Sequence, residues 1–285
     1  METGYQKKYY PDLPGFRLHH TAGPNAADST TSHLHLNASR MVLYCIRGSG
    51  NIVVEDKAYH LQTGDVLITD SAELFHCTID PNSYHERISI HINAQFWNQF
   101  PWDTASLFRC FTNREKGVGN LIPAKAVESS GFGKLFQELL TTVQQSKPTR
   151  DMAAVSQLIQ LLLLLNRIAG SATVYGETST KNPQIQEILQ YLNHHCTKDI
   201  SVDSIAQHFH ITPSHLAHQF KVHTGFSPWN YVILRRLHNA NVLMRKGVSA
   251  EEACYAVGFD NYANFYRLYK RHTGISPSQF KKQIR

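Results

Sequence analysis

The hexapeptide HTGFSP at residues 223–228 returns 49 residues later as HTGISP at residues 272–277. In each copy the glycine suits the left-handed position that ends a helix, and the serine suits the N-cap of the next helix. The proline suits the first turn of that helix, where its missing N–H costs nothing. Each hexapeptide therefore predicts the end of one helix and the immediate start of another.

The neighbouring residues support this interpretation. Gln279 stands three residues after Ser276 and completes a capping box. Further apolar pairs that can staple the chain to each new helix are Ile275 with Phe280 and Phe226 with Tyr231.

The sequence before each hexapeptide repeats as a pattern. The stretches SVDSIAQHFHITPSHLAHQFKVHTG, from residue 201, and SAEEACYAVGFDNYANFYRLYKRHTG, from residue 249, each read as a short helix, a turn and a longer amphipathic helix. We therefore predict two helix-turn-helix units joined by a long helix.

A chain of 285 residues is about twice the length of a common domain and predicts two domains. We expect a first domain at 1–170, a small and polar linker at 171–182 and a second domain at 183–285. The net charge is +6, and twelve Lys or Arg against six Asp or Glu from residue 183 onward account for all of it. This asymmetry fits a C-terminal domain that binds a polyanion, although charge alone equally fits a solvated basic surface.

The pattern of apolar residues changes along the first domain. Residues 29–80 alternate β-branched or aromatic residues with polar ones and contain glycine turns, which predicts β-strands. Apolar residues at three- and four-residue spacing then predict helices at 131–145 and 151–170. The leucine run 161–165 makes the second helix apolar on nearly every side, which fits either a subunit interface or burial within the same domain. The fold class we expect is α+β, with an N-terminal β-barrel and two helices followed by an all-α domain.

The five cysteines are widely spaced and contain no CxxC pair, which argues against a disulfide framework or a thiolate zinc site. The N-terminus has no apolar signal core, and Gln160 and Asn166 interrupt the most apolar run well short of a membrane span. These features predict a soluble, cytoplasmic protein that does not use a membrane.

The C-terminal third resembles the DNA-binding domain of AraC/XylS-type transcription regulators. The resemblance rests on residues 205–228, on residues 256–277 and on linker-helix positions such as Arg236 and Ala240. Cys254 and Met244 are conservative departures from the family pattern. The resemblance implies that the second helix of each unit enters a major groove of double-stranded DNA, with the units about 34 Å apart.

Helix geometry and the resemblance together suggest the DNA-contacting residues. In the second unit Phe265 and Tyr269 should face the core, and Arg267 can address guanine while Asn264 can address adenine. In the first unit Leu216 and Phe220 should face inward, and we expect weaker base reading there with more phosphate contact. The expected DNA-binding residues are Ser214, Ala217, His218, Lys221, Ala263, Asn264, Arg267, Lys270 and Arg271.

The N-terminal part resembles the cupin-like sensor barrel of the same regulators, through the His-x-His of residues 33–35, glycine turns and His76. Metal-binding cupins carry a glutamate a few residues after the histidine pair, and this chain has Arg40 in that region. Three imidazoles suffice for zinc, whereas a cationic arginine would repel it. We assign no metal and no cofactor. The expected ligand-binding residues are His33, His35, Arg40, Tyr44 and His76.

We therefore expect a transcription regulator controlled by a small polar or anionic effector, with a sugar as one candidate. Its partners would be double-stranded DNA, the effector, a second copy bound through the helices between Leu135 and Leu165, and RNA polymerase if it is an activator. Two alternatives remain open. The barrel histidines can be purely structural, and the chain can be a cupin-type metal-dependent enzyme with a helical appendage, although no catalytic residues stand out.

Overall fold

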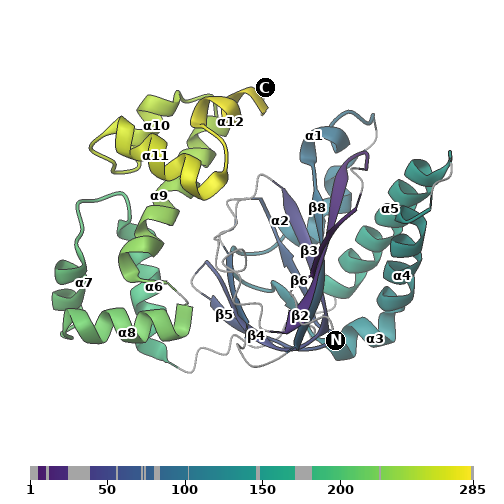
Figure 1. The fold of residues 1–285 in the computed structure, drawn as a ribbon, viewed down its shortest axis with the longest axis horizontal. Helices are drawn as coiled ribbons and strands as arrows, with labels where there is room; N and C mark the ends of the chain where they lie inside the picture. The colour runs from purple at the N-terminus through teal and green to yellow at the C-terminus, as the bar shows by residue number, and fades with distance from the viewer. Residues whose placement is uncertain are drawn as a thin grey trace.

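The computed structural model describes residues 6–10, 13–24, 39–55, 57–71, 73, 75–79, 84–101, 103–145, 148–170, 182–224 and 226–283. The chain folds into a sheet-rich N-terminal domain and a helical C-terminal domain (Figure 1), so the α+β class is confirmed. The predicted linker residues 171–181, together with His33, His35 and Gly225, lie outside the described residues.

Two antiparallel sheets form the N-terminal domain. A six-stranded sheet has the order β1-β2-β8-β3-β6-β9, and a three-stranded sheet has the order β5-β4-β7. The strands are β1 (Gln6–Tyr9), β2 (Phe16–Pro24), β3 (Arg40–Arg47), β4 (Gly50–Val54), β5 (Lys57–Leu61), β6 (Val66–Thr69), β7 (Phe75–Ile79), β8 (Tyr84–Ile92) and β9 (Leu121–Ile122).

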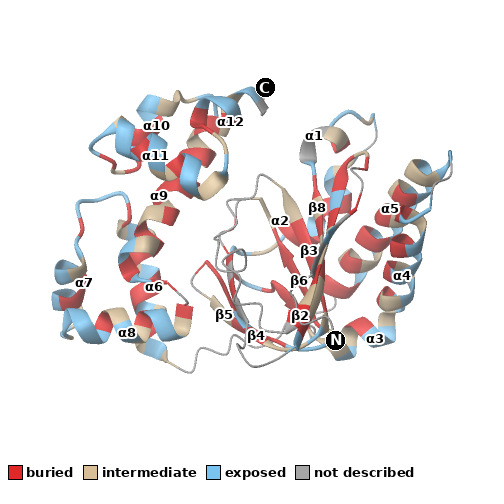
Figure 2. Ribbon diagram, in the orientation of Figure 1, coloured by how far each residue is buried: buried red, intermediate tan, exposed pale blue. Residues whose placement is uncertain are grey.

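Both faces of the six-stranded sheet are covered, and β3 shows how. Val42 packs in the cluster that contains the sheet-covering helices, whereas Leu43 packs with β4, β5 and β7 in the cluster between the two sheets. Successive side chains of a strand point to opposite faces, so odd-numbered β3 residues face the barrel interior and even-numbered ones face the helices. Figure 2 shows the resulting burial along the strands.

The helices of this domain pack on the outer face of the six-stranded sheet (Figure 1). The two helices predicted after the strands are confirmed as α4 and α5. Shorter helices complete the helical layer on this face of the sheet. The elements are α1 (Ala94–Trp97), η1 (Ala105–Phe108), α2 (Arg109–Thr112), α3 (Ala124–Ser130), α4 (Phe132–Val143) and α5 (Arg150–Ala169).

Helix α5 is, among the described residues, the helix long and apolar enough to cross a membrane by length and composition alone. Its residues Leu158, Leu161, Leu162 and Leu165 are buried in the hydrophobic core of the sheet-rich domain. The burial therefore accounts for most of the leucine run, while Leu163 is 53% exposed.

The described part of the C-terminal domain contains seven helices. A first helix-turn-helix unit contains α7 and α8, a second contains α10 and α11, and the long helix α9 joins them, as predicted. The elements are α6 (Pro183–His195), α7 (Val202–His208), α8 (Pro213–Thr224), α9 (Pro228–Arg245), α10 (Ala250–Ala256), α11 (Tyr262–Thr273) and α12 (Pro277–Gln283).

The repeated hexapeptides have the local roles expected of them. Gly274 has φ +77° and ends α11, and the Ser276 hydroxyl accepts a hydrogen bond from the Gln279 amide (3.1 Å). The Gln279 side chain in turn accepts from the Ser276 amide (2.8 Å), which completes the capping box. Ser227 caps α9 through the Asn230 amide (3.2 Å).

The turns inside the two units also correspond. His210 and Gly258 both have positive φ, +55° and +93°, just after the first helix of each unit. A side chain at Gly258 would lie 2.6 Å from the Thr197 carbonyl oxygen, so this position requires glycine. The two units therefore share one backbone path, although histidine occupies the strained position in the first.

Candidate nucleic-acid interface and sensor interior

Helix α11 presents a polar stripe to solvent. The Asn261 side chain caps the helix by accepting from the amides of Ala263 (2.8 Å) and Asn264 (3.2 Å). Phe265 and Tyr269 are fully buried, which fixes the opposite side of the helix as the exposed one. The predicted contact residues on that side are all exposed: Ala263, Asn264, Arg267, Lys270 and Arg271.

The two best base-reading candidates of this helix touch each other. Arg267 Nη2 donates to Asn264 Oδ1 (3.0 Å), one helical turn apart. An arginine fork matches O6 and N7 of guanine, and a neighbouring amide can hold that fork in position. The pair therefore presents a hydrogen-bonded guanidinium and amide on the exposed side of α11.

Helix α8 also buries one side and exposes the other, but its exposed residues differ from those of α11. Thr212 caps it through the His215 amide (3.2 Å), and Leu216 and Phe220 are fully buried. Of the predicted contact residues, Ser214, His218 and Lys221 are exposed and Ala217 is half-buried.

Aligning the two units by the 49-residue offset adds two exposed residues to those predicted from the spacing within each helix. The 49-residue offset places His215 opposite Asn264 and Ala217 opposite Tyr266. Tyr266 is 37% exposed. The offset between the hexapeptides was the signal that could have found it.

Arg236 of α9 joins the two units. Its guanidinium donates to the carbonyl oxygens of Cys196 (2.6 Å), Lys198 (2.8 Å) and Gly258 (2.6 Å). Burial lowers the pKa of Arg236. The guanidinium still donates all three hydrogen bonds. One side chain therefore ties the linker helix to loops on both sides of it.

In the sensor, the predicted ligand residues that can be placed do not lie on the interior face. Arg40 pairs with Asp70 (3.0 Å) and covers the Phe108 ring, and Tyr44 packs edge-on against Phe132 and Phe136 of α4. Both side chains thus belong to the helix-covered face. Burial raises the pKa of Tyr44, which keeps its hydroxyl neutral.

The remaining predicted ligand residues are less fully described. His33 and His35 lie outside the described residues, and the backbone of His76 pairs with Val53 in the three-stranded sheet. Among the described residues there is no group of three His, Cys, Asp or Glu side chains that could hold a metal ion.

The interior face does carry a polar strip, on strands outside the segment that the sequence pattern singled out. Ile88 and Ile90 of β8 pack toward the helices, so Arg87, Ser89 and His91 point to the interior. Register places Leu43 beside Ser89 on one side. The corresponding neighbours on β2 are Thr21, His19 and Arg17, opposite Arg87, Ser89 and His91 respectively.

Side-chain contacts connect the residues of this strip. Ser89 Oγ lies 3.1 Å from His91 Nε2, and the His19 and His91 rings are 4.7 Å apart. Arg87 Nη1 reaches the Cys77 sulfur of β7 (3.6 Å), across the space between the sheets. Half-buried Arg87, Ser89 and His91 therefore combine a cation with hydroxyl and imidazole groups.

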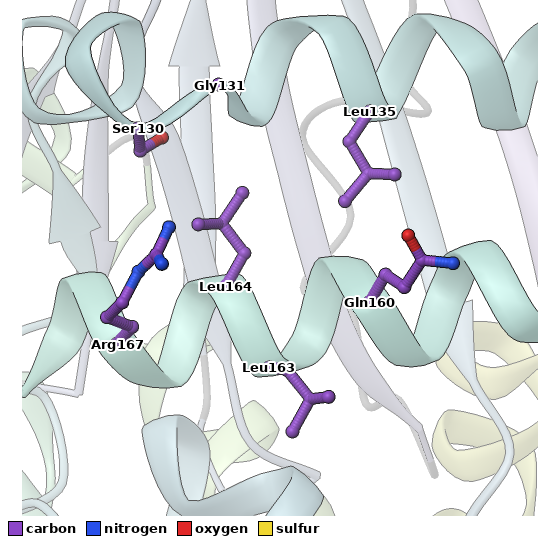
Figure 3. Close-up of a pocket in the computed structure, with 7 residues that line it drawn as sticks. All are labelled: Ser130, Gly131, Leu135, Gln160, Leu163, Leu164 and Arg167. Atoms are coloured by element: carbon purple, nitrogen blue, oxygen red, sulfur yellow. The ribbon is translucent and has the colours of Figure 1, made fainter.

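A shallow groove lies between α4 and α5 on the outside of the same domain (Figure 3). Leu135, Leu163 and Leu164 supply its apolar part, and Gln160 and Arg167 lie on α5 beside them. Ser130 and Gly131 close one end of the groove.

Comparisons with known proteins match both the N-terminal and the C-terminal domain. A family model described as an AraC-like ligand binding domain matches residues 22–162, and one described as a helix-turn-helix domain matches residues 205–283. The arabinose operon regulatory protein of Escherichia coli (strain K12) is 25% identical over 241 residues, which cover 83% of this chain and 78% of that protein. The uncharacterized HTH-type transcriptional regulator YdiP of the same organism is 25% identical over 268 residues, which cover 89% of this chain and 81% of that protein. With an AraC-like ligand-binding domain followed by paired helix-turn-helix units, the chain belongs to the AraC/XylS-type family of transcription regulators.

Proposed function

We propose that this regulator binds a small polar or anionic effector inside its barrel and binds a two-part DNA site through α8 and α11. The observation that carries the effector proposal is the polar strip around Arg87 between two sheets that are otherwise apolar. Arg87 is half-buried there, and its guanidinium fork suits a carboxylate or a phosphate.

The strip also defines the class of effector. Ser89 and His91 can bond hydroxyl groups, and the neighbouring side chains of Met41 and Leu43 supply apolar surface. Small-molecule sites commonly combine apolar walls with a few polar groups that fix orientation. We therefore include sugars and small organic acids among the candidates. The proposed contribution of His33, His35 and His76 remains compatible with this site, whereas Arg40 and Tyr44 would act from the helix-covered face.

On DNA we propose a division of labour. Asn264 and Arg267 of α11 read bases, and α8, with His218 and Lys221, contributes mainly phosphate contacts. We propose activation as the mode of regulation, with RNA polymerase as the protein partner. The cellular location that follows from a DNA target is the cytoplasm.

We propose domain boundaries at 1–170 and 183–285, with 171–182 as the linker. They are supported by the end of α5 at Ala169 and the start of α6 at Pro183.

We further propose that two copies associate through the groove between α4 and α5. Leu163 is 53% exposed beside Leu135 and Leu164, and a second copy would cover this apolar surface. Leu163→Glu should convert a dimer to a monomer in sedimentation at micromolar concentration. A wild-type chain that is already monomeric there would refute the dimer.

The proposed function is tested by measuring affinity for a selected duplex with and without a panel of sugars and small organic acids. We expect one class of compound to change the affinity of the wild-type chain and not that of Arg87→Ala. Arg109→Ala serves as the matched control, because it removes the same charge from an exposed position on α2. Equal responses of both variants would remove the interior strip from the effector site.

The second candidate class, a cupin-type metal-dependent enzyme, makes a different prediction. Purified protein would contain a stoichiometric metal and would turn over a substrate. Burial raises the pKa of the interior thiol Cys45 to about 12, so this side chain is not a nucleophile at neutral pH.

A further inference from the structure

The hairpin between β4 and β5 makes the central contact between the two domains. Glu55, at its turn, is buried and has a positive φ of +55°, a conformation that non-glycine residues seldom adopt. Its carboxylate pairs with Arg235 Nη1 of the linker helix α9 at 2.5 Å. Both side chains are nearly enclosed, with 7% of Glu55 and 11% of Arg235 exposed.

Further groups surround this ion pair. Tyr231 Oη, one turn before Arg235 on α9, donates to the Glu55 carbonyl oxygen (2.9 Å) and lies 2.8 Å from Asn193 Oδ1. Val53 is 5% exposed and packs in the apolar cluster of the first helix-turn-helix unit. Burial is the largest single influence and lowers the pKa of Arg235, but Glu55, Tyr231 and Cys196 together outweigh it and the pKa is raised. The sensor thus contacts the C-terminal domain through the Glu55–Arg235 ion pair, the hydrogen bond from Tyr231 to the Glu55 carbonyl oxygen and the packing of Val53.

A second contact lies at the other end of the same helix. Arg245 Nη1 donates to the Ser71 carbonyl oxygen (3.4 Å), beside Asp70, which pairs with Arg40. The sensor therefore holds α9 near both of its ends, and α9 in turn sets the relation between the two units through Arg236.

Strand β4 also faces the interior of the sensor. Ile52 and Val54 pack between the sheets, while Val53 points to the DNA-binding domain. Ile52 is paired with Cys77, whose sulfur contacts Arg87. A single strand thus separates the polar strip from the helix that spaces the two units.

We propose that the β4–β5 hairpin is an autoinhibitory clamp, through which the sensor restrains the linker helix until the clamp is released. The exposed residues of α8 and α11 are not covered by the sensor, so the clamp acts by holding the units in one orientation. Release would let both units adjust to a duplex and would free Arg235 from the Glu55 carboxylate and Arg245 from the Ser71 carbonyl oxygen. The Glu55 carboxylate itself disfavours nearby phosphates.

The first test is amide hydrogen exchange on the full chain, which needs neither DNA nor effector. Glu55→Gln keeps the shape of the side chain and removes its charge. We expect faster exchange both in β5 and in residues 228–236, with α10–α12 unchanged. Glu138→Gln, which removes one exposed carboxylate from α4, should change neither segment. Faster exchange confined to the hairpin would overturn the clamp.

The second test is the affinity of the full chain for one fixed duplex, and it rests on the proposed function. Glu55→Gln should bind at least about fivefold more tightly than wild type, the usual lower range of coupling between sites. The charge-reversed pair Glu55→Arg with Arg235→Glu should return toward wild type. Unchanged or weaker binding by Glu55→Gln would refute autoinhibition.

Arg235→Gln breaks the same pair from the other side and serves if Glu55→Gln does not fold. If the wild-type chain bound no duplex, the proposed function would fail, while the exchange experiment would still decide whether the clamp exists.

Discussion

Helix α8 of the first helix-turn-helix unit and helix α11 of the second each span twelve residues and bury two large side chains at the same spacing. Their exposed stripes differ. Where α11 presents Asn264 and Arg267, α8 presents His215 and His218. Where α11 ends its stripe with Arg271, α8 has Val222, which is 61% exposed.

This difference shows that the buried and the exposed residues of the two helices have separate roles. Leu216 and Phe220 in one unit, and Phe265 and Tyr269 in the other, keep the backbone the same. The exposed positions are free to differ, so the same scaffold can anchor at one end and specify sequence at the other.

The largest effect should come from breaking the joint between the units. Arg236→Ala removes three charge-assisted hydrogen bonds to backbone carbonyl oxygens, of which the bond to Cys196 is buried. We expect a loss of about 3 kcal/mol in the free energy of unfolding, measured by urea denaturation of the full chain. Lys246→Ala, at an exposed site at the end of the same helix, is the control. A loss below about 1 kcal/mol would mean that the units are held together elsewhere.

The second prediction compares equivalent substitutions in α11 and α8. Arg267→Ala should weaken binding to the preferred duplex by about 1–3 kcal/mol and relax the preference at one base pair. His218→Ala, at the equivalent position of the first unit, should cost less and leave the preferences intact. Quantitative gel shifts on the preferred and on a random duplex measure both. Equal losses on the two duplexes would exclude Arg267 from base reading.

The smallest effect concerns the phosphate contacts. Lys221→Ala should weaken all duplexes alike and reduce the slope of log affinity against log salt by about one, because one phosphate contact is lost. Its counterpart Lys270→Ala should behave similarly. A sequence-dependent loss in either variant would contradict a pure phosphate role.

The repeat made the C-terminal domain predictable from sequence. Gly274, Ser276 and Gln279 act within a few residues of one another, so their roles follow from local backbone geometry. The inward positions followed from helical spacing together with the family resemblance. Tyr266 was missed because the spacing was counted within one helix instead of being compared between the two units.

The sensor was less predictable for a physical reason. Both faces of β3 are buried, so alternation along the strand does not reveal which face lines the interior. Tyr44 and Leu43 are neighbours in sequence and lie on opposite faces. The interior strip lies on β2 and β8, outside the segment 29–80 in which the sequence pattern predicted strands. Strict alternation in ERISIHI, residues 86–92, was the available signal.

The contacts of Glu55 lay beyond sequence reasoning altogether. Its partner Arg235 is 180 residues away, and no local pattern links a hairpin turn to a linker helix. Only the packing of the two domains brings these charges together.

Selection of binding sites from random duplexes by the full chain tests the division between the two units most directly. We predict two elements about 10 base pairs apart, one with strong base preferences and one with weak preferences. In the Arg267→Ala chain the strong element should lose a preference while the weak one stays unchanged. Two equally strong elements in the wild type, or a loss confined to the weak element, would contradict the account.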